Sequence, residues 1–282
     1  IPAAIETALA SAAARLAPVT DCPALEAQLL LGHALGKDRA YLLAWPQRTL
    51  SGEQLAAFQA LVRRRCTGEP LAYITGRREF WSLDLEVSPH TLVPRPETEL
   101  LVELALQHLP PGERRWVADL GTGSGAIALA VARERPLARI IAGDASAEAL
   151  AVARRNAERL GLANVEFRQG DWFAPLAGER VDILCCNPPY LRDDDPHLRS
   201  GDLAHEPRAA LAAGPTGLEA IEAVIDRARA HLRPGASLIL EHGYDQGAAV
   251  ARCLTEAGLE QVAAHRDLAG HWRAATARAP LR

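Results

Sequence analysis

The sequence of 282 residues lacks several features that define whole classes of protein. It has no run of about 18 apolar residues, so we expect no transmembrane helix. Its five cysteines are scattered and form no C-x-x-C pair, which argues against a disulfide framework or a zinc site and favours a reducing cytoplasm. The nine histidines include no H-E-x-x-H spacing, and we therefore predict no bound metal.

Methionine is absent altogether, even at the first position, so we expect further residues to precede Ile1 in the primary product. Apolar residues account for 49% of the chain and charged residues for 23%. This composition is typical of a globular protein, and the length allows one large domain or two smaller ones. Because the net charge is -4, nothing in the charge favours nucleic acid, and we expect neither nucleic acid nor a membrane as a direct partner.

Residues 1–75 are predicted to form a separate helical domain. Apolar residues recur at helical spacing over residues 5–16, 24–35 and 50–66. Thr20 or Asp21 is expected to cap the second helix, and Ser51 the third. The arginines at 63–65 end the third helix, where cations favour the helix dipole, and we prefer this interpretation to a phosphate-binding patch.

A change of pattern over residues 76–95 predicts a β-hairpin that links this domain to the rest of the chain. Apolar side chains alternate here, at Phe80, Trp81, Leu83, Leu85 and Val87. A polar break follows near Ser88. Pro96 then fits the first turn of a helix that runs to Leu109, and Glu97 suits the positive end of that helix.

Strands and helices alternate in the remaining domain, residues 96–282. The expected strands are residues 116–120, 138–143, 165–168, 181–186 and 237–241. The expected helices are residues 124–135, 146–161 and 218–232, and the tail can add two strands around Gly270. Such alternation predicts an α/β fold with a doubly wound, mostly parallel, Rossmann-like sheet. Residues 191–216 form a long irregular stretch, which is typical of a functional lid or a disordered loop.

A glycine-rich loop follows the first of these strands. It comprises Gly121, Thr122, Gly123, Ser124 and Gly125. Glycines let a ligand lie close to the backbone, and the next helix offers free N–H groups to an anion. Asp144 ends the second strand, where an acidic side chain can bind ribose hydroxyls. The loop alone leaves three interpretations open: a dinucleotide, S-adenosylmethionine, or a tight turn without a ligand.

Asp171 and Trp172 follow the third strand and form a candidate adenine contact. The carboxylate would accept from the exocyclic amine, and the indole would cover the ring face. The alternative is a turn residue beside a core tryptophan. Cys185 and Cys186 end the fourth strand, and we interpret them as small core residues on opposite faces of the sheet.

The fourth strand stops on an unusual polar segment. It consists of Asn187, Pro188, Pro189 and Tyr190. Ligands of doubly wound sheets lie outside the carboxyl ends of the first and fourth strands, so this segment and the glycine loop should face one crevice. Asn187 Oδ1 and the Pro188 carbonyl can accept both hydrogens of a planar NH₂ group, while Tyr190 can stack on it. Two such acceptors would stabilise positive charge on a nitrogen that attacks a sulfonium methyl group.

At this point the sequence resembles a known family. The stretches "DLGTGSG" at 119–125 and "NPPY" at 187–190 are similar to those of class I S-adenosylmethionine-dependent methyltransferases acting on planar nitrogens. Further stretches narrow the resemblance: "REFWS" at 78–82, "PRPETE" at 94–99 and "EHG" at 241–243. Together with the helical N-terminal domain, they resemble the HemK-type enzymes that methylate the glutamine of the Gly-Gly-Gln motif in bacterial peptide-chain release factors.

The resemblance implies a role for each motif. Residues 121–125 would line the methionine part of S-adenosylmethionine, Asp144 would bind its ribose, and Asp171 with Trp172 would bound its adenine. Residues 187–190 would hold the glutamine amide, and Asn187 would also contact the cofactor. Arg95, Glu97 and Thr98 would close the pocket near the cofactor. The N-terminal domain would dock the release factor, and we expect the enzyme to be a monomer.

Three rival functions remain open at this stage. The asparagine–proline motif is shared with adenine-amino DNA methyltransferases, which flip a base into the same kind of pocket. A relative that methylates a glutamine of a ribosomal protein is a closer rival. A dinucleotide-dependent oxidoreductase would use the glycine loop but would leave residues 187–190 unexplained.

Overall fold

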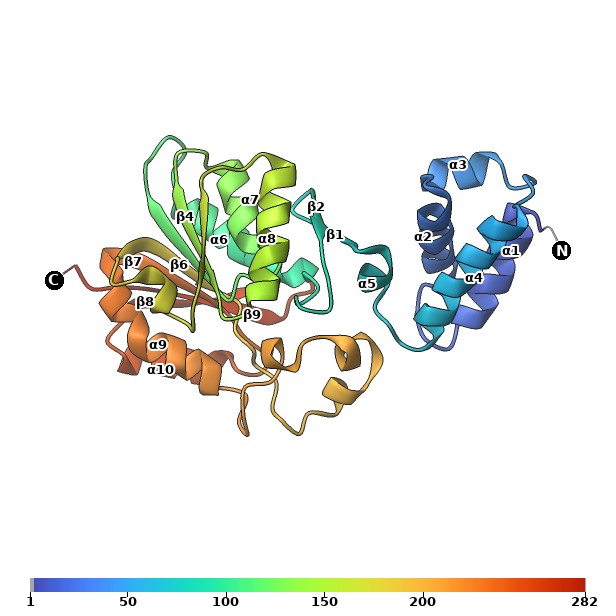
Figure 1. Cartoon of the computed structure of the whole chain (residues 1–282). Helices are drawn as coiled ribbons and strands as arrows, with labels where there is room; N and C mark the ends of the chain where they lie inside the picture. Colours follow the sequence, from blue (N-terminus) through green and yellow to red (C-terminus); the bar gives the residue numbers. More distant parts are fainter. Residues whose placement is uncertain (1–2, 282) are drawn as a thin grey trace. The chain divides into compact units, whose positions relative to one another are not determined.

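The computed structural model describes residues 3–281 and divides the chain into two units. The first unit comprises Ile1–Gly76 together with Arg199–His205, and the second comprises Arg77–Leu198 and Glu206–Arg282. Figure 1 labels most helices and strands of both units. The short stretch Arg199–His205 lies within the irregular loop predicted from the sequence, so the chain passes between the two units three times.

The first unit is built from short helices around an apolar core. They are α1 Ile5–Leu16, α2 Pro23–Leu35, α3 Arg39–Ala44, α4 Gly52–Cys66 and α5 Leu71–Thr75. The three predicted helices are confirmed, whereas α3 and α5 are too short to show a helical period. Ser51 caps α4 as predicted, in a capping box with Gln54. The predicted cap of α2 is wrong, because Cys22 holds that position without a side-chain bond and Thr20 donates to Glu26 instead.

Arg65 is a buried cation of this unit, with 4% of its surface exposed. Its Nε donates to Glu26 Oε2 at 2.7 Å and its Nη1 donates to Asp202 Oδ1 at 2.9 Å. Arg65 lies in the last turn of α4, as predicted. It also ties α4 to the stretch Arg199–His205 through its ion pair with the partly exposed Asp202, which no local sequence pattern indicates.

Replacing Arg65 by alanine should release this stretch. The change leaves the Glu26 carboxylate without its partner in a largely buried place, and removing one partner of a buried pair costs about 3 kcal/mol. We expect faster hydrogen exchange over residues 199–205 and a lower free energy of unfolding of the first unit. The control is Arg63→Ala, because Arg63 is exposed on the same helix. Equal exchange in the two variants would contradict the anchoring role.

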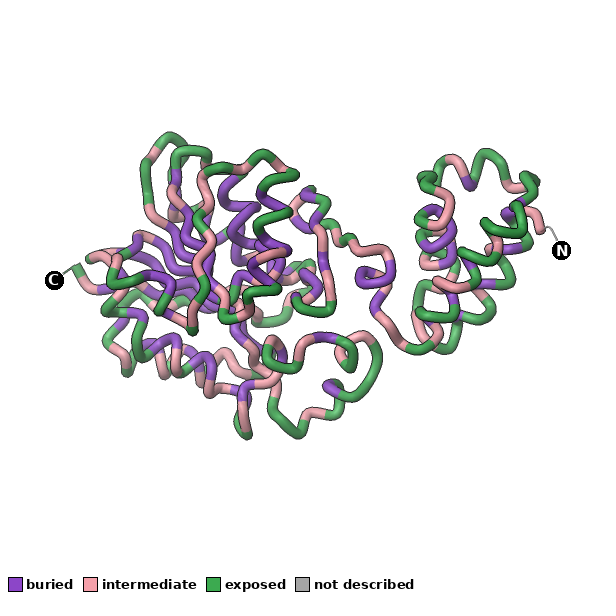
Figure 2. The backbone as a smooth tube through the Cα atoms, in the orientation of Figure 1, coloured by how far each residue is buried: buried purple, intermediate pink, exposed green. Residues whose placement is uncertain are grey.

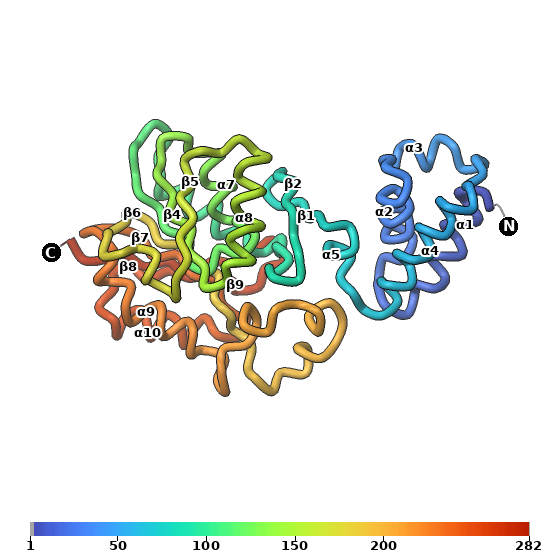
Figure 3. The backbone as a smooth tube through the Cα atoms, in the orientation of Figure 1, coloured from blue at the N-terminus to red at the C-terminus, as the bar shows by residue number. Residues whose placement is uncertain are grey.

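A seven-stranded sheet forms the centre of the second unit. The strands are β3 Trp116–Leu120, β4 Arg139–Asp144, β5 Val165–Gln169, β6 Val181–Cys186, β7 Leu232–Glu241, β8 Glu260–Arg266 and β9 Trp272–Arg278. Their order is β5-β4-β3-β6-β7-β9-β8, with all neighbours parallel except those of β9. The predicted α/β, mostly parallel sheet is confirmed. Figure 3 traces the chain through it, with β8 and β9 added last.

Helices cover both faces of this sheet. One face packs against α6 Glu99–Gln107, α7 Ala126–Glu134 and α8 Ala147–Leu160, and the other against α9 Glu219–His231 and α10 Gly247–Glu256. Figure 2 shows the buried backbone concentrated between these layers. Cys185 and Cys186 are fully buried and belong to the cores on opposite faces, as predicted. The sequence prediction missed α10, which begins at a glycine and has no side-chain cap.

The predicted hairpin exists, and its strands β1 Arg77–Phe80 and β2 Leu83–Glu86 pair antiparallel. Its turn is at Trp81 and Ser82, which have φ angles of 51° and 55°. The polar break near Ser88 is therefore outside the hairpin. Phe80 packs with α6 and α7 in one core of the second unit, so the hairpin is part of that unit.

The irregular stretch 191–216 contains only short helices. These are η3 Pro196–Arg199, η4 Gly201–His205 and η5 Arg208–Ala210, and one bridge joins Leu191 to Ala212. A further short helix, η1 Pro96–Thr98, precedes α6, and η2 Ala174–Leu176 follows β5. Within residues 3–281, no helix combines the length and the apolar character needed to cross a membrane.

Candidate functional site

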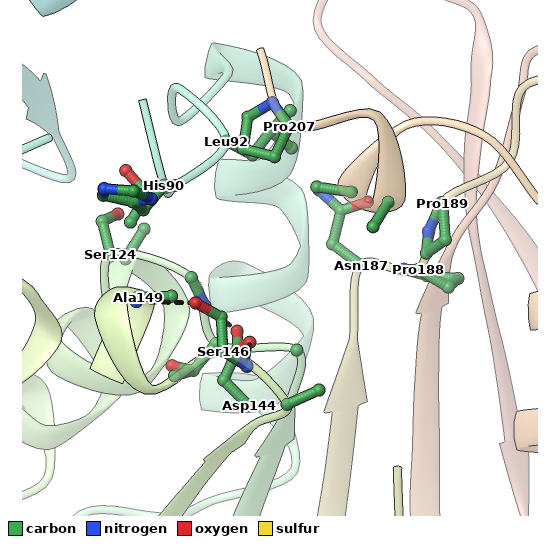
Figure 4. A pocket seen from close by; sticks show the side chains of 18 of the residues that line it. His90, Leu92, Ser124, Asp144, Ser146, Ala149, Asn187, Pro188, Pro189 and Pro207 are labelled. Carbon is green, nitrogen blue, oxygen red and sulfur yellow. Dashed lines mark hydrogen bonds between the residues drawn. The ribbon is translucent and has the colours of Figure 1, made fainter. Parts of the chain in front are cut away.

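A cavity of about 350 Å³ opens at the carboxyl ends of β3, β4 and β6, within the second unit. Its walls include most of the residues that the sequence pointed to: Gly121, Thr122, Gly123, Ser124, Asp144, Asp171, Trp172, Asn187, Pro188 and Pro189. Figure 4 shows Asp144 on one side of the cavity and Asn187 on another. The pairing of β3 with β6 brings the two motifs together, because parallel neighbours end at the same edge.

The glycine loop turns back on the end of β4. The N–H groups of Gly121 and Thr122 both donate to the carbonyl of Gly143 at 2.9 Å. Gly121, Gly123 and Gly125 have φ angles of 73°, 57° and 87°, which residues other than glycine rarely adopt. Open space therefore lies beside Gly121 and Gly123, where a Cβ would meet nothing within 4 Å, while the N–H groups of both residues are bonded within the protein. Gly125 itself does not line it, because it caps α7 and packs beneath the loop.

Gly125 should tolerate no side chain. A Cβ at this position would lie 2.9 Å from Leu129 Cδ1, in addition to the strain of its positive φ. We expect Gly125→Ala to lower the free energy of unfolding by about 1–3 kcal/mol more than Gly161→Ala, measured in urea. Gly161 is the matched control, since its φ is 68° and a Cβ there would meet nothing within 4 Å. Equal losses would show that only backbone strain matters at Gly125.

Asp144 holds the loop and still offers acceptor capacity to a ligand. Its Oδ2 accepts from the Gly123 N–H and its Oδ1 accepts from the Ser146 N–H, both at 2.9 Å. A carboxylate has about four lone-pair sites, so two are used and two are left for hydroxyl groups. The same side chain therefore shapes the loop and can receive a ribose.

Asp119 is a site residue that the sequence interpretation used only as part of a motif. Its side chain is 1% exposed, and its Oδ2 accepts from Thr122 Oγ1 at 2.7 Å and from the Ala128 N–H at 3.2 Å. Burial raises the pKa of Asp119 to about 6, against the lowering effect of Thr122. Asp119 supports the glycine loop from below and is not part of the cavity wall.

Asn156 fixes the loop from the other side. It is completely buried on α8, and its Nδ2 donates to the carbonyls of Ser124 and Glu86, each at 2.9 Å. Its Oδ1 accepts from the Glu86 N–H at 2.7 Å. One amide thus joins the glycine loop to strand β2. In the sequence it stands in an ordinary amphipathic helix, and no signal marks it.

Trp172 borders the cavity and also packs against the core between the sheet and α9. Its contact with an adenine ring stays a prediction. Its φ of 44° is strained for a bulky residue, as the chain turns sharply after β5. Asp171 lies beside it in the wall, and its carbonyl accepts from the Ala174 N–H.

The segment after β6 separates into two parts. Asn187, Pro188 and Pro189 line the cavity, whereas Tyr190 packs against the core and donates its hydroxyl to Glu241 Oε1 at 3.3 Å. Asn187 Nδ2 donates to Thr98 Oγ1 at 3.2 Å. The stacking role expected of Tyr190 stays a prediction, and its hydroxyl is engaged below the cavity.

Of the residues assigned to closure of the pocket, Arg95 and Thr98 line the cavity and Glu97 does not. No sequence pattern indicated Glu206, whose side chain is fully buried. Glu206 accepts from the Val93 N–H at 2.9 Å and forms an ion pair with Arg95. Glu206 therefore connects two stretches that line the cavity: residues 90–95, which it contacts, and residues 207–210, which follow it in the chain.

Known protein families match both units. Residues 7–76 match the PrmC N-terminal domain, and residues 98–206 match the methyltransferase small domain. Among solved structures, a methyltransferase from Pyrococcus furiosus superposes with a TM-score of 0.53 at 20% identity, over 79% of this chain and 98% of that one. At this identity the likeness shows the fold alone.

Two relatives are much more similar in sequence. The release factor glutamine methyltransferase of Xylella fastidiosa strain Temecula1 is 52% identical over 256 residues, which cover 91% of this chain and 93% of the relative. The protein of the same name from Vibrio cholerae is 48% identical over 273 residues, covering 95% of this chain and 94% of the relative. Identity of this degree over almost the full length shows that the chain belongs to the release factor glutamine methyltransferase family.

Proposed function

We propose that this enzyme transfers a methyl group from S-adenosylmethionine to the side-chain amide of the glutamine in the Gly-Gly-Gln motif of a release factor. The family and the names of the relatives support the substrate class. The observation that carries the chemistry is the shared cavity, whose wall includes both the glycine loop and residues 187–189. On this proposal, the cofactor and the planar NH₂ group of the substrate would bind in the same space.

The residues present fit S-adenosylmethionine. Gly121 and Gly123 leave open space in the cavity wall, and Asp144 keeps two acceptor sites for ribose hydroxyls. Trp172 supplies an aromatic wall and Asp171 an acceptor for the adenine amine. Bound there, the cofactor would supply an electrophilic methyl group without help from a metal ion.

The protein would act by holding the amide nitrogen. Asn187 Oδ1 and the Pro188 carbonyl would accept its two hydrogens and aim its lone pair into the cavity. These acceptors also stabilise the positive charge that develops on an attacking amide nitrogen, which is a weak nucleophile because its lone pair is delocalised. Directly after the transfer the nitrogen would carry a positive charge and be strongly acidic, so it would release one proton to water without a strong base and leave the neutral N-methyl amide.

The first unit is proposed to dock the release factor. Four of its large apolar side chains are substantially exposed: Leu25, Leu29, Leu43 and Trp45. Exposed apolar groups of this kind, a tryptophan among them, are typical of protein interfaces. The proposal takes the enzyme to be a cytoplasmic monomer, in keeping with its five free cysteines, with no nucleic acid or membrane as a direct partner.

Mass spectrometry of an unmodified release factor, incubated with this chain and S-adenosylmethionine, tests the proposal. One added methyl group on the Gly-Gly-Gln glutamine would support it. Adenine-containing DNA and ribosomal proteins are supplied in the same mixture as competitors. Methylated DNA or a methylated ribosomal-protein glutamine beside an unmodified release factor would overturn the substrate assignment.

A further inference from the structure

A buried chain of hydrogen bonds runs from Asn187 away from the cavity. Asn187 Nδ2 donates to Thr98 Oγ1 at 3.2 Å, and Thr98 Oγ1 donates to Glu241 Oε2 at 2.7 Å. Thr98 is 4% exposed and Glu241 is 1% exposed. Three segments far apart in the sequence, namely η1, the end of β6 and the end of β7, thus meet in one network.

The order of donors in this chain follows from the hydroxyl of Thr98. A hydroxyl has one hydrogen, and an ionised carboxylate can only accept, so Thr98 must donate to Glu241. Its oxygen can then only accept from Asn187, and the Asn187 amide must present its NH₂ group to Thr98. Asn187 Oδ1 is left for the cavity, and among the residues that the structure describes none donates to it.

We propose that Glu241 is a positioning residue, which through Thr98 sets the Asn187 amide with its oxygen toward the substrate nitrogen. The inference rests on the proposed function, because only a substrate that offers NH₂ hydrogens needs an acceptor at this place. With the opposite setting, Asn187 would present its own NH₂ group to the substrate NH₂ group, and neither could accept. Whether Asn187 presents its oxygen or its NH₂ group to the substrate is therefore decided by Glu241, which lies outside the cavity wall.

The surroundings of Glu241 make this setting sensitive to pH. Burial raises the pKa of Glu241 to about 7, while the Thr98 hydrogen bond, Arg273 and Tyr190 oppose the shift and Glu97 adds to it. Tyr190 donates to Glu241 Oε1, and burial raises the pKa of this phenol, so it stays a donor. Burial also raises the pKa of the nearby Cys186 thiol, and it lowers the pKa of His242, the buried residue that follows Glu241 in the chain.

Protonation of Glu241 would remove the constraint on the Thr98 hydroxyl. A neutral carboxyl group no longer demands a hydrogen from Thr98, which can then donate to Asn187 Oδ1 and reverse the amide. The ionised form is the competent one, so kcat should fall as the pH drops below about 7, by about 10-fold per unit. Above that pH the rate should level off.

The test follows the amide of Asn187 directly. The chain has only three asparagines, Asn156, Asn164 and Asn187, so labelling with ¹⁵N-asparagine gives three side-chain amide signals, assigned with an Asn187→Ala sample. In the protein without ligands, the Asn187 signals should shift with a midpoint near pH 7, and in Glu241→Gln they should not. A pH-independent Asn187 signal in the wild type would overturn the inference.

Kinetics supply the second readout. Glu241→Gln and Thr98→Val should each lower kcat by about 10–100-fold with KM for S-adenosylmethionine little changed, because only the aim of the amide is lost. Thr98→Ser keeps the hydroxyl and should recover most of the rate that Thr98→Val loses. Unchanged kcat in both Glu241→Gln and Thr98→Val would also overturn the inference. A wild-type enzyme that leaves release factors unmodified would refute the proposed function. The pH dependence of the Asn187 amide signals would still decide whether Glu241 positions Asn187 through Thr98.

Discussion

Replacing Asn187 with alanine should abolish almost all methyl transfer while leaving S-adenosylmethionine bound. The side chain lies in the cavity wall, and its Oδ1 is the acceptor that we assign to the substrate nitrogen. Removal of one preorganised group that stabilises developing charge lowers kcat by about 10²–10³-fold. Cofactor affinity, measured by calorimetry, should change little, because the glycine loop and Asp144 are untouched.

The comparison needs a variant that loses an amide elsewhere. Gln107→Ala serves this purpose, since Gln107 is exposed at the end of α6 and does not line the cavity. This control should keep both the rate and the affinity. A parallel fall of affinity and rate in Asn187→Ala would mean that Asn187 binds the cofactor and that its assignment to the substrate is wrong.

Replacing Asp144 with alanine should have the opposite effect: the affinity for S-adenosylmethionine should fall strongly, and the rate of methyl transfer at saturating cofactor should fall much less. The variant loses the two proposed ribose acceptors and frees the N–H groups of Gly123 and Ser146. Hydrogen bonds to a charged group contribute about 1.5–3 kcal/mol each, so we expect affinity to fall by about 100-fold or more. Calorimetric titration with S-adenosylmethionine measures the change, and kcat at saturating cofactor should fall much less.

Asp226→Ala is the control for charge, because Asp226 is exposed on α9. It should bind the cofactor as the wild type does. The melting temperature of Asp144→Ala should be recorded alongside, since the loop loses support even without ligand. Wild-type affinity in Asp144→Ala would remove Asp144 from the cofactor site and leave it as a loop support only.

Much of the second unit could be predicted from local patterns. Strand β3 and strand β6 have the predicted bounds, because short apolar runs between turn residues leave little choice to a buried strand. In the first unit, Ser51 caps α4 as expected, since a capping box is written in four consecutive positions. Features of this kind depend only on residues that are close together in the sequence, so the sequence alone is enough to find them.

What the sequence did not indicate are contacts between distant residues. Arg65 lies in the last turn of α4 as predicted, but the sequence did not show its bonds to Glu26 and to Asp202, the latter 137 positions along the chain. The stacking role of Tyr190 stays a prediction, and the bond from its hydroxyl to Glu241 on the next strand was not foreseen. Glu206 and Asn156 stand in unremarkable surroundings in the sequence, and only their buried hydrogen bonds reveal what they join.

The sequence by itself determined the family, the order of the strands and of the helices other than α10 after residue 96, and the two motifs that meet at one edge of the sheet. Parallel pairing makes that meeting nearly unavoidable, because neighbouring strands present their carboxyl ends on the same side. Only the tertiary structure shows the hydrogen bond from Asn187 Nδ2 to Thr98 Oγ1, through which we propose that the amide is oriented. The sequence could not indicate this bond or the next one, because Thr98 donates to the buried carboxylate of Glu241, which is 143 positions away in the chain.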